Sequence, residues 1–231
     1  MTSLHICPTL ILDLDGTLVD SAVTITSTLN IMRDRDRLPP LDIEAVKPFI
    51  SLGAEKLLEA TLPHQNIGIS TKLQQFRSIY LDSEILPDNL FEGVDDTLIL
   101  LKSLGVGLAI CTNKPRPLTV KTLEATGIAR HFDCTVCGSE TPNDKPAPDQ
   151  LLLILEMLGA QRQDCLFVGD TRVDHQASLA AGIPFMFFPS GYDPEVNWTS
   201  GVLQFPTRSF SPDIILETFE RMGQFNASAD T

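Results

Sequence analysis

The stretch Leu10-Ile11-Leu12-Asp13-Leu14-Asp15-Gly16-Thr17-Leu18 decides how this chain folds. It begins as a short apolar run and continues into two aspartates separated by one residue. Buried strands are apolar because both of their faces exclude water, and burying carboxylates without partners is costly. We therefore expect Asp13 and Asp15 to lie where a buried strand ends and its sheet opens to solvent. In open α/β sheets, this edge is where ligands bind.

Further apolar runs alternate with helical patterns along the rest of the chain. The runs cover residues 106–111, 132–137, 165–168 and 184–188. The predicted helices between them cover residues 95–104, 117–126, 148–158 and 172–181. A glycine follows each predicted helix, as a C-terminal cap would. This alternation predicts an α/β fold with a doubly wound parallel sheet.

The interval from Asp20 to Phe91 breaks that alternation. It has apolar residues at helical spacing over 20–32, 51–61 and 70–83, but no convincing buried strand. We predict a helical cap domain over residues 19–91, inserted into a core domain formed by residues 1–18 and 92–231. An insert that begins beside the two aspartates would lie over them.

The composition excludes several classes of partner. The chain has 231 residues, of which 43% are hydrophobic and 20% charged, and a formal net charge of −13. Nonspecific nucleic-acid binding draws on clustered lysine and arginine, and anionic membrane surfaces attract basic segments. We therefore expect neither partner. A small anionic substrate remains compatible, because a lysine and a cation can reverse the field inside a pocket.

The same sequence predicts a cytoplasmic protein. The first residues lack the pattern of a secretory signal, and no apolar run approaches the roughly 20 residues that span a membrane. The five cysteines are scattered and odd in number, which does not favour a disulfide framework. Cys134 and Cys137 have C-x-x-C spacing within a predicted strand, where their side chains point to opposite faces. We interpret them as core residues.

Polar residues follow the later apolar runs as they follow the first. Thr112 and Asn113 end the second run, and Lys145 lies in the loop after the third. Asp170 and Asp174 follow the fourth. Because the carboxyl ends of parallel strands share one edge, we expect all these residues to meet Asp13 and Asp15.

Four carboxylates and one lysine at one edge predict phosphoryl chemistry. The carboxylates would repel one another without a cation, and oxygen ligands suit Mg²⁺. The Thr112 hydroxyl and the backbone N–H of Asn113 are suitable phosphate ligands, and Lys145 adds positive charge. Positioning and charge neutralisation supply most of the catalysis in phosphoryl transfer.

The two aspartates of the first stretch can take separate roles. A carboxylate can attack phosphorus to form an aspartyl phosphate, while a second protonates the leaving oxygen and later deprotonates water. Asp13 lies at the end of the strand and is the candidate nucleophile. Asp15 is the candidate acid and base, and Gly16 lets the backbone turn tightly beside it.

These motifs resemble those of the haloacid dehalogenase superfamily of phosphatases. The stretch from Asp13 to Ser21 is similar to the first motif, Thr112-Asn113 to the second, Lys145-Pro146 to the third and residues 169–174 to the fourth. The resemblance implies Mg²⁺ bound by the Asp13 carboxylate, the Asp15 carbonyl and Asp170. It also implies that Asp174 holds Lys145 or a metal-bound water.

Within that superfamily, Phe91-Glu92-Gly93-Val94 and Thr112-Asn113-Lys114-Pro115 resemble phosphoglycolate-phosphatase-like members. The chain departs from their pattern at Ser51-Leu52-Gly53-Ala54, where a glycine-rich loop is usual, and over the long segment 189–208. We predict a phosphatase for a small phosphorylated metabolite, acting as a monomer or homodimer. Phosphoglycolate is the first candidate, followed by pyrophosphate, a nucleotide monophosphate or a sugar phosphate.

Other classes of protein remain as alternatives. A sugar phosphomutase shares these motifs but needs a bisphosphate activator. A noncatalytic phosphate-binding or signalling module can also gather aspartates and a lysine at a sheet edge, but it does not need so large an insert. Dehalogenases lack the second aspartate. The phosphonate-cleaving branch needs a cap lysine, for which Lys56 is poorly placed.

Overall fold

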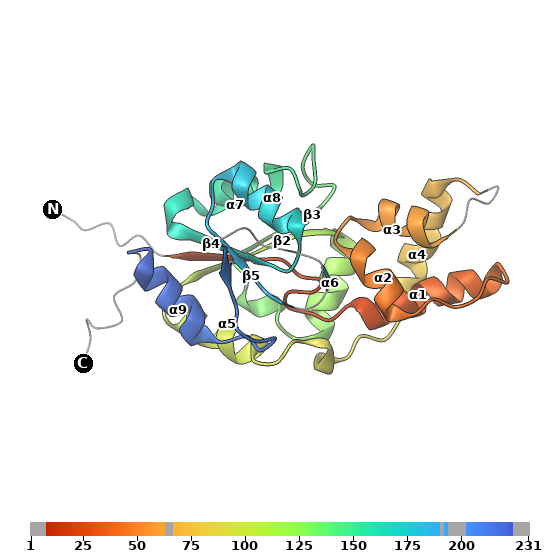
Figure 1. The fold of residues 1–231 in the computed structure, drawn as a ribbon, viewed down its shortest axis with the longest axis horizontal. Coiled ribbons are helices and arrows are strands. Elements are labelled where there is room, and N and C mark those ends of the chain that lie inside the picture. Colours follow the sequence, from red (N-terminus) through yellow and green to blue (C-terminus); the bar gives the residue numbers. More distant parts are fainter. Residues whose placement is uncertain (1–7, 63–66, 190–191, 194–201, 224–231) are drawn as a thin grey trace.

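The computed structural model describes residues 8–62, 67–189, 192–193 and 202–223. A sheet with helices on both faces lies at one end of the molecule and a group of helices lies at the other (Figure 1). The second group comes from the stretch between the first two strands of the sheet. Part of the long segment 189–208, namely residues 190–191 and 194–201, lies outside the described residues.

The sheet has six parallel strands in the order β3-β2-β1-β4-β5-β6. The strands are β1 Thr9–Leu12, β2 Gly107–Pro115, β3 Cys134–Gly138, β4 Cys165–Gly169, β5 Phe185–Phe187 and β6 Leu203–Gln204. Leu12 pairs with Ile110 on one side and Val168 on the other. The strand that carries the two aspartates is therefore central, and its carboxyl end lies beside those of β2 and β4. The predicted parallel α/β sheet is confirmed.

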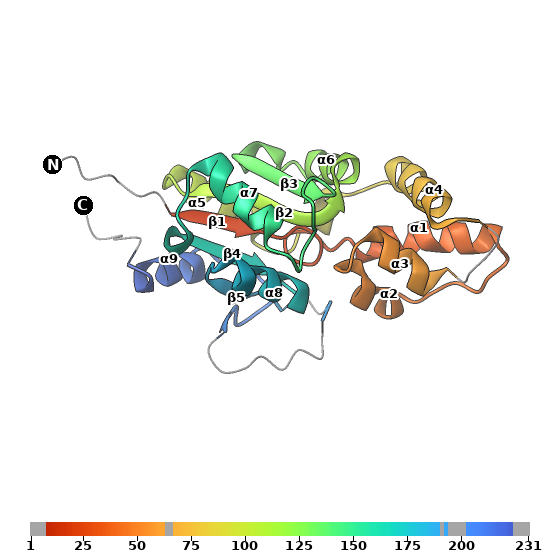
Figure 2. The ribbon, with the colours of Figure 1, turned by 90° about the horizontal axis from the view of Figure 1, so that it is seen from above.

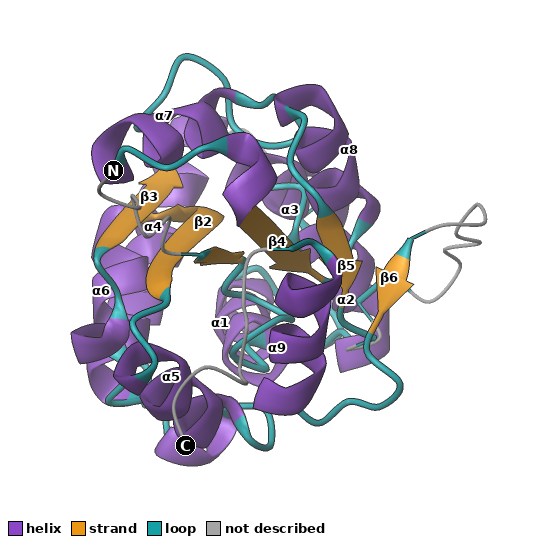
Figure 3. Ribbon diagram, turned by 90° about the vertical axis from the view of Figure 1, so that its left-hand side faces the viewer, coloured by secondary structure: helices purple, strands orange, loops and turns teal. Residues whose placement is uncertain are grey.

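Helices cover both faces of this sheet. They are α5 Val94–Ser103, α6 Arg116–Ala125, α7 Asp149–Leu158, α8 Arg172–Ala181 and α9 Pro212–Arg221. Figure 3 shows α7 and α8 on one face and α5, α6 and α9 on the other. Leu10 and Leu12 pack into one apolar cluster and Ile11 into the opposite one, as the alternation of a strand requires. Short 3-10 helices occur at Pro87–Asn89, Ala129–His131 and Arg162–Asp164.

The inserted stretch folds into α1 Ala22–Arg35, α2 Ile43–Ile50, α3 Ala54–Thr61 and α4 Ile69–Asp82. These helices, which we call the cap, lie beyond the carboxyl end of β1 (Figure 2). They share an apolar cluster that includes Leu29, Leu58 and Tyr80. This cluster also includes Leu118 of α6 and Tyr192, so the cap packs against the rest of the molecule at the edge where the motif residues gather.

The structure differs from the sequence prediction at several elements. The helix predicted over 51–61 begins only at Ala54, because Gly53 lies in the left-handed region with φ 92° and interrupts it. Residues 43–50 form a separate helix that was not predicted, and neither were β6 and α9. Strand β2 runs past Cys111 to Pro115, so Thr112 and Asn113 lie within a strand. Within the described ranges, no helix has both the length and the apolarity to cross a membrane.

Candidate active site

The turn after β1 places its two aspartates next to the neighbouring strands. The backbone N–H of Asp13 donates to the carbonyl of Val168 at 2.9 Å, which extends the pairing with β4 beyond the strand. Gly16 follows with φ 88°, and a Cβ atom there would lie 2.2 Å from Asp170 Oδ2. Only glycine fits, because a side chain would displace the Asp170 carboxylate.

Lys145 lies at the centre of the site and makes three polar contacts. Its Nζ donates to Asp13 Oδ1 at 2.7 Å, to Asp174 Oδ1 at 2.7 Å and to the carbonyl of Cys111 at 2.8 Å. An ammonium group has three N–H donors, so all three are used. Burial alone would lower the pKa of Lys145, but the carboxylates of Asp13 and Asp174 outweigh burial and raise it above its usual range.

Two amide side chains hold the loop that carries Lys145. Asn113 Nδ2 donates to the carbonyl of Lys145 at 2.9 Å, and Asn113 Oδ1 accepts the N–H of Lys145 at 3.0 Å. Gln150, buried in α7, donates through Nε2 to the carbonyls of Thr112 and Cys137, each at 3.0 Å. The side chain of Asn113 is therefore occupied in positioning Lys145, whereas the predicted role of Asn113 concerns its backbone N–H.

Three carboxylates gather beside this lysine. One oxygen from each of Asp13, Asp170 and Asp174 lies within 4.8 Å of the others, and all three residues are buried. Thr17 Oγ1 donates to Asp170 Oδ1 at 3.2 Å. Burial and the charge of Asp174 together raise the pKa of Asp13 to about 7, against the lowering effect of Lys145.

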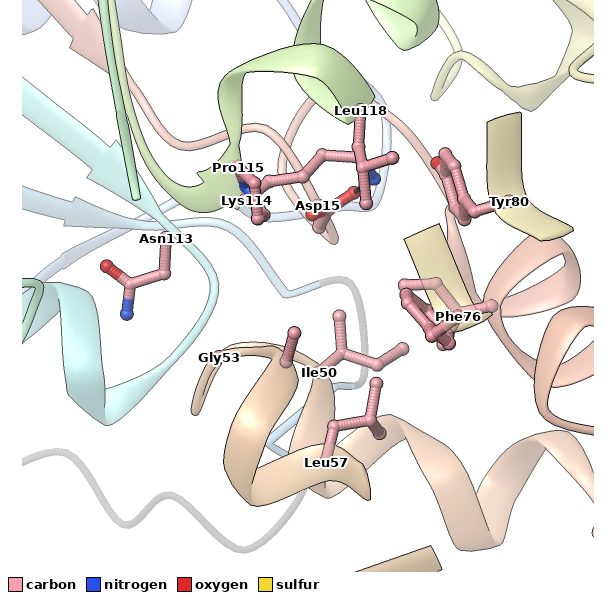
Figure 4. Close-up of a pocket in the computed structure, with 12 residues that line it drawn as sticks. Asp15, Ile50, Gly53, Leu57, Phe76, Tyr80, Asn113, Lys114, Pro115 and Leu118 are labelled. Atoms are coloured by element: carbon pink, nitrogen blue, oxygen red, sulfur yellow. Dashed lines mark hydrogen bonds and ion pairs between the residues drawn. The ribbon is translucent and has the colours of Figure 1, made fainter. Parts of the chain in front are cut away.

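Asp15 has a different lysine as its partner. Lys114 Nζ donates to Asp15 Oδ1 at 2.7 Å, and the hydroxyl of Ser21 donates to the same oxygen. The Lys114 side chain is 4% exposed and its Nζ lies 4.5 Å from the centre of the Tyr80 ring. Figure 4 shows Lys114 and Asp15 together on the core side of a cavity, opposite cap residues that include Ile50 and Phe76.

The charges of the site suit one divalent cation. Four buried carboxylates (Asp13, Asp15, Asp170 and Asp174) face two buried ammonium groups (Lys114 and Lys145), which leaves two negative charges. The donors are oxygens, as Mg²⁺ prefers. Asp174 is engaged by Lys145 and by the N–H and hydroxyl of Thr171. The Asp13 and Asp170 carboxylates are thus the pair best placed to hold a cation.

The structure brings every predicted site residue to one edge of the sheet. A small cavity beneath the cap is lined by Asp13, Asp15, Thr112, Asn113 and Lys145, and Asp170 and Asp174 lie beside Asp13. Of the two roles considered for Asp174, it makes the contact with Lys145. Sequence reasoning assigned no role to Lys114, Gln150 or Ser51. For Gln150, the available signal was a polar residue directly before the apolar run of α7.

Comparison with known proteins identifies the class. Residues 10–188 match the model of the haloacid dehalogenase-like hydrolase family. Phosphoglycolate phosphatase 1 of Pseudomonas aeruginosa is 37% identical to this chain over 188 residues, which are 78% of this chain and 69% of that protein. Phosphoglycolate phosphatase of Escherichia coli K12 is 34% identical over 203 residues, which are 78% of this chain and 81% of that protein.

The similarity extends to solved structures. The crystal structure of a predicted phosphoglycolate phosphatase from Haemophilus somnus 129PT superposes with a TM-score of 0.82 at 26% identity, covering 94% of this chain and all of that one. The chain therefore belongs to the haloacid dehalogenase-like hydrolase family. The family predicted from the four motifs is confirmed.

Proposed function

We propose that this protein is a Mg²⁺-dependent phosphatase that hydrolyses a small phosphomonoester through a phosphorylated Asp13. The observation that carries the proposal is the position of Asp13. Its carboxylate is paired with Lys145 at 2.7 Å, lies in a cluster with Asp170 and Asp174, and lines a cavity under the cap. A nucleophile, a fixed positive charge and a potential cation site therefore converge on one small space.

The first half of the proposed reaction transfers the phosphoryl group to the protein. A carboxylate oxygen of Asp13 attacks phosphorus as the bond between phosphorus and the ester oxygen breaks. Asp15 gives its proton to the leaving oxygen. Both recorded hydrogen bonds of the Asp15 carboxylate, among the described residues, use Oδ1. We propose that Oδ2 makes the proton transfer.

The second half releases phosphate. Asp15, now ionised, takes a proton from a water molecule that attacks the phosphorus of the aspartyl phosphate. The bond between Asp13 and phosphorus breaks, which restores the Asp13 carboxylate. The Thr112 hydroxyl, the Asn113 backbone N–H and Lys145 would hold the phosphoryl oxygens. Thr112 is 2% exposed and its Oγ1 accepts the N–H of Lys114 at 3.1 Å, so its own hydroxyl proton is available to donate.

We propose that Asp13, Asp170 and the backbone carbonyl of Asp15 hold the Mg²⁺ ion. When bound, the ion offsets the two excess negative charges of the site and polarises the phosphoryl group. We further propose a division into a core, residues 1–18 and 92–231, and a cap, residues 19–91. The cap would exclude bulk water during transfer and would select the substrate.

The relatives' names make 2-phosphoglycolate the first candidate substrate. The cavity beside Asp15 has a volume of about 30 Å³, and a larger cavity of about 310 Å³ lies between the cap residues Pro48, Ser51 and Leu52 and the start of α8. The cysteines support a reducing cytosol as the location, because Cys111, Cys134, Cys137 and Cys165 are all buried and free.

Phosphate release from a panel of phosphomonoesters, measured with and without Mg²⁺, tests the proposal. We expect release that requires Mg²⁺ and is greatest for a small ester. Release of no phosphate from any member would contradict the proposed function and favour a binding or signalling role. Formation of an isomerised sugar phosphate, with a requirement for a bisphosphate, would identify a mutase instead.

A further inference from the structure

Lys114 has hydrogen-bonding capacity that the protein does not use. Its Nζ is buried at the end of β2, between the core and α4 of the cap. Its Nζ donates to Asp15 Oδ1 and is also hydrogen-bonded to the side chain of Tyr80, whereas an ammonium group has three N–H donors. Buried donors in native proteins are almost always paired. Among the described residues, one donor of Lys114 is therefore left for a ligand.

The space in front of Lys114 is small and lies next to the proposed phosphoryl site. A cavity of about 30 Å³ touches Lys114, Asp15 and the apolar cap residues Ile50, Leu57 and Phe76 (Figure 4). A second cavity of about 10 Å³ touches Asp13, Thr112 and Lys145. Both are also lined by Asp15, Ile50, Asn113 and Lys114.

Ser51 supplies a second unsatisfied group in the adjoining cavity. This residue joins α2 to the loop before α3 and lines the smaller cavity with Lys114. Its Oγ atom is buried and has no hydrogen-bond partner among the described residues. Asn113 Nδ2 donates to the carbonyl of Ser51 at 3.3 Å and so ties this part of the cap to the core. A buried hydroxyl without a partner is costly, and a bound ligand would remove that cost.

The start of α3 adds a weaker attraction for negative charge. Gly53 is its N-cap, and no side chain caps the helix. Gly53 and Ala54 line the cavity of Lys114. The first N–H groups of a helix lack partners within it, and this end carries partial positive charge.

We propose that Lys114 and Ser51 form a carboxylate subsite, which binds an acid group on the part of the substrate that leaves with the ester oxygen. This inference rests on the proposed function, because it places the ester oxygen at Asp15. One N–H donor of Lys114 and the hydroxyl of Ser51 match the two oxygens of one carboxylate. One positive charge suits a carboxylate better than a second phosphate, which carries about two negative charges.

The size of the cavity restricts what stands between the two charged groups. A water molecule needs roughly 10–15 Å³ of such space, so about 30 Å³ holds only a few atoms. With the cap placed as in this structure, the cavity beside Lys114 fits a small acid group. A hexose does not fit there.

The test compares two esters that differ in this one group. The kcat/KM for 2-phosphoglycolate and for the neutral 2-hydroxyethyl phosphate is measured in the presence of Mg²⁺. We expect the unmodified protein to prefer 2-phosphoglycolate by roughly 100-fold, the order of magnitude for a buried charge pair. Lys114→Met should bring the ratio of the two values close to one. Ser51→Ala, which leaves Lys114 and Asp15 in place, should lower the ratio by about 5- to 10-fold.

Lys56→Met is the matched control, because Lys56 is an exposed lysine on α3. It should leave the ratio unchanged. A ratio near one in the unmodified protein would overturn the subsite while leaving the phosphatase intact. Equal losses for both esters in Lys114→Met would also overturn it, because Lys114 would then act only through Asp15.

A binding measurement keeps the subsite testable apart from turnover. On an Asp13→Asn background, calorimetry should show that adding Lys114→Met weakens 2-phosphoglycolate binding by roughly 100-fold. The same change should leave the affinity for 2-hydroxyethyl phosphate within about threefold. Unaltered affinity for 2-phosphoglycolate would contradict the subsite even if the protein releases no phosphate from any ester.

Discussion

The site has two parts, and each contains one buried lysine. We call the part around Asp13, Lys145 and Asp174 the floor, and the part around Asp15 and Lys114 the cap-facing side. Lys145 on the floor donates to Asp13, Asp174 and the Cys111 carbonyl. Lys114 on the cap-facing side donates to Asp15 and otherwise faces an aromatic ring and a cavity. Each lysine contacts one aspartate of the first motif, yet only Lys145 has every donor satisfied within the protein.

Lys145 is therefore a fixed positive charge, whereas Lys114 can still bind a ligand. Lys145 is held by its carboxylates and by Asn113, so it presents the same charge whichever ester arrives. Lys114 is bonded to Asp15 and Tyr80, has one donor left for a ligand, and lies beside the apolar cap residues of the cavity. Under the proposed function, the sheet edge carries out the chemistry, and the surface where the cap meets that edge selects the ester.

The largest expected effect is the loss of turnover when Asp13, on the floor of the site, is replaced. Asp13→Asn removes the nucleophile but keeps the shape of the side chain, so we expect kcat to fall on the order of 10⁴-fold or more. Phosphate release measures the loss, and circular dichroism checks the fold. Retention of full activity would disprove the aspartyl-phosphate mechanism.

The two lysines should differ in what they contribute to stability. Lys145→Met leaves Asp13 and Asp174 buried without their cation, which costs about 3–5 kcal/mol in the free energy of unfolding. Lys114→Met should cost roughly 1–3 kcal/mol, since Asp15 keeps its bond to Ser21 and its side chain is 12% exposed. Urea unfolding without Mg²⁺ measures both losses, with Lys56→Met as the control.

Equal losses from the two lysine variants would remove the distinction between the floor and the cap-facing side. A larger loss from Lys114→Met would reverse it. The contrast holds only if Lys145→Met is the more destabilising change in the same buffer.

The carboxylate cluster of the floor should also respond to Mg²⁺. At a concentration one hundred times its dissociation constant, the ion should stabilise the fold by about 2.7 kcal/mol. Asp170→Asn should abolish this gain and raise the melting temperature of the Mg²⁺-free protein, because it removes one of three neighbouring negative charges. Thermal unfolding with and without Mg²⁺ measures both effects.

Asp88→Asn, at an exposed aspartate far along the chain from the cluster, should leave the Mg²⁺ response as it was. An unchanged Mg²⁺ response in Asp170→Asn would show that the ion binds elsewhere.

The smallest expected effect concerns the ring beside Lys114. Tyr80→Phe removes a hydroxyl that lies 3.1 Å from Thr122 Oγ1 but keeps the ring beneath Lys114. We expect a loss of about 1 kcal/mol in stability and less than a threefold change in kcat/KM. Tyr80→Leu also removes the cation–π contact, worth about 1 kcal/mol more. Identical results for the two variants would show that the ring does not stabilise Lys114.

Much of the floor could be predicted from the sequence. Apolar runs that end in aspartates indicated which strands are buried and where they open, and the parallel arrangement then placed Asp13, Thr112 and Asp170 at one edge. The helices α5, α6, α7 and α8 followed from their periodicity and their glycine caps. In contrast, β6 and α9 were missed, although Ile215 and Phe219 of α9 complete the apolar cluster on one face of the sheet.

By itself, the sequence determined the class of fold, the excess of negative charge and which polar residues gather at the sheet edge, because these follow from composition and from patterns local to one strand or helix. Only the tertiary structure decided how those charges are paired. Lys114 and Asp15 lie 99 positions apart, and Ser51 and Asn113 lie 62 apart. Which donor remains unused depends on the packing of the cap against the sheet edge, and burial then makes that donor available to a ligand.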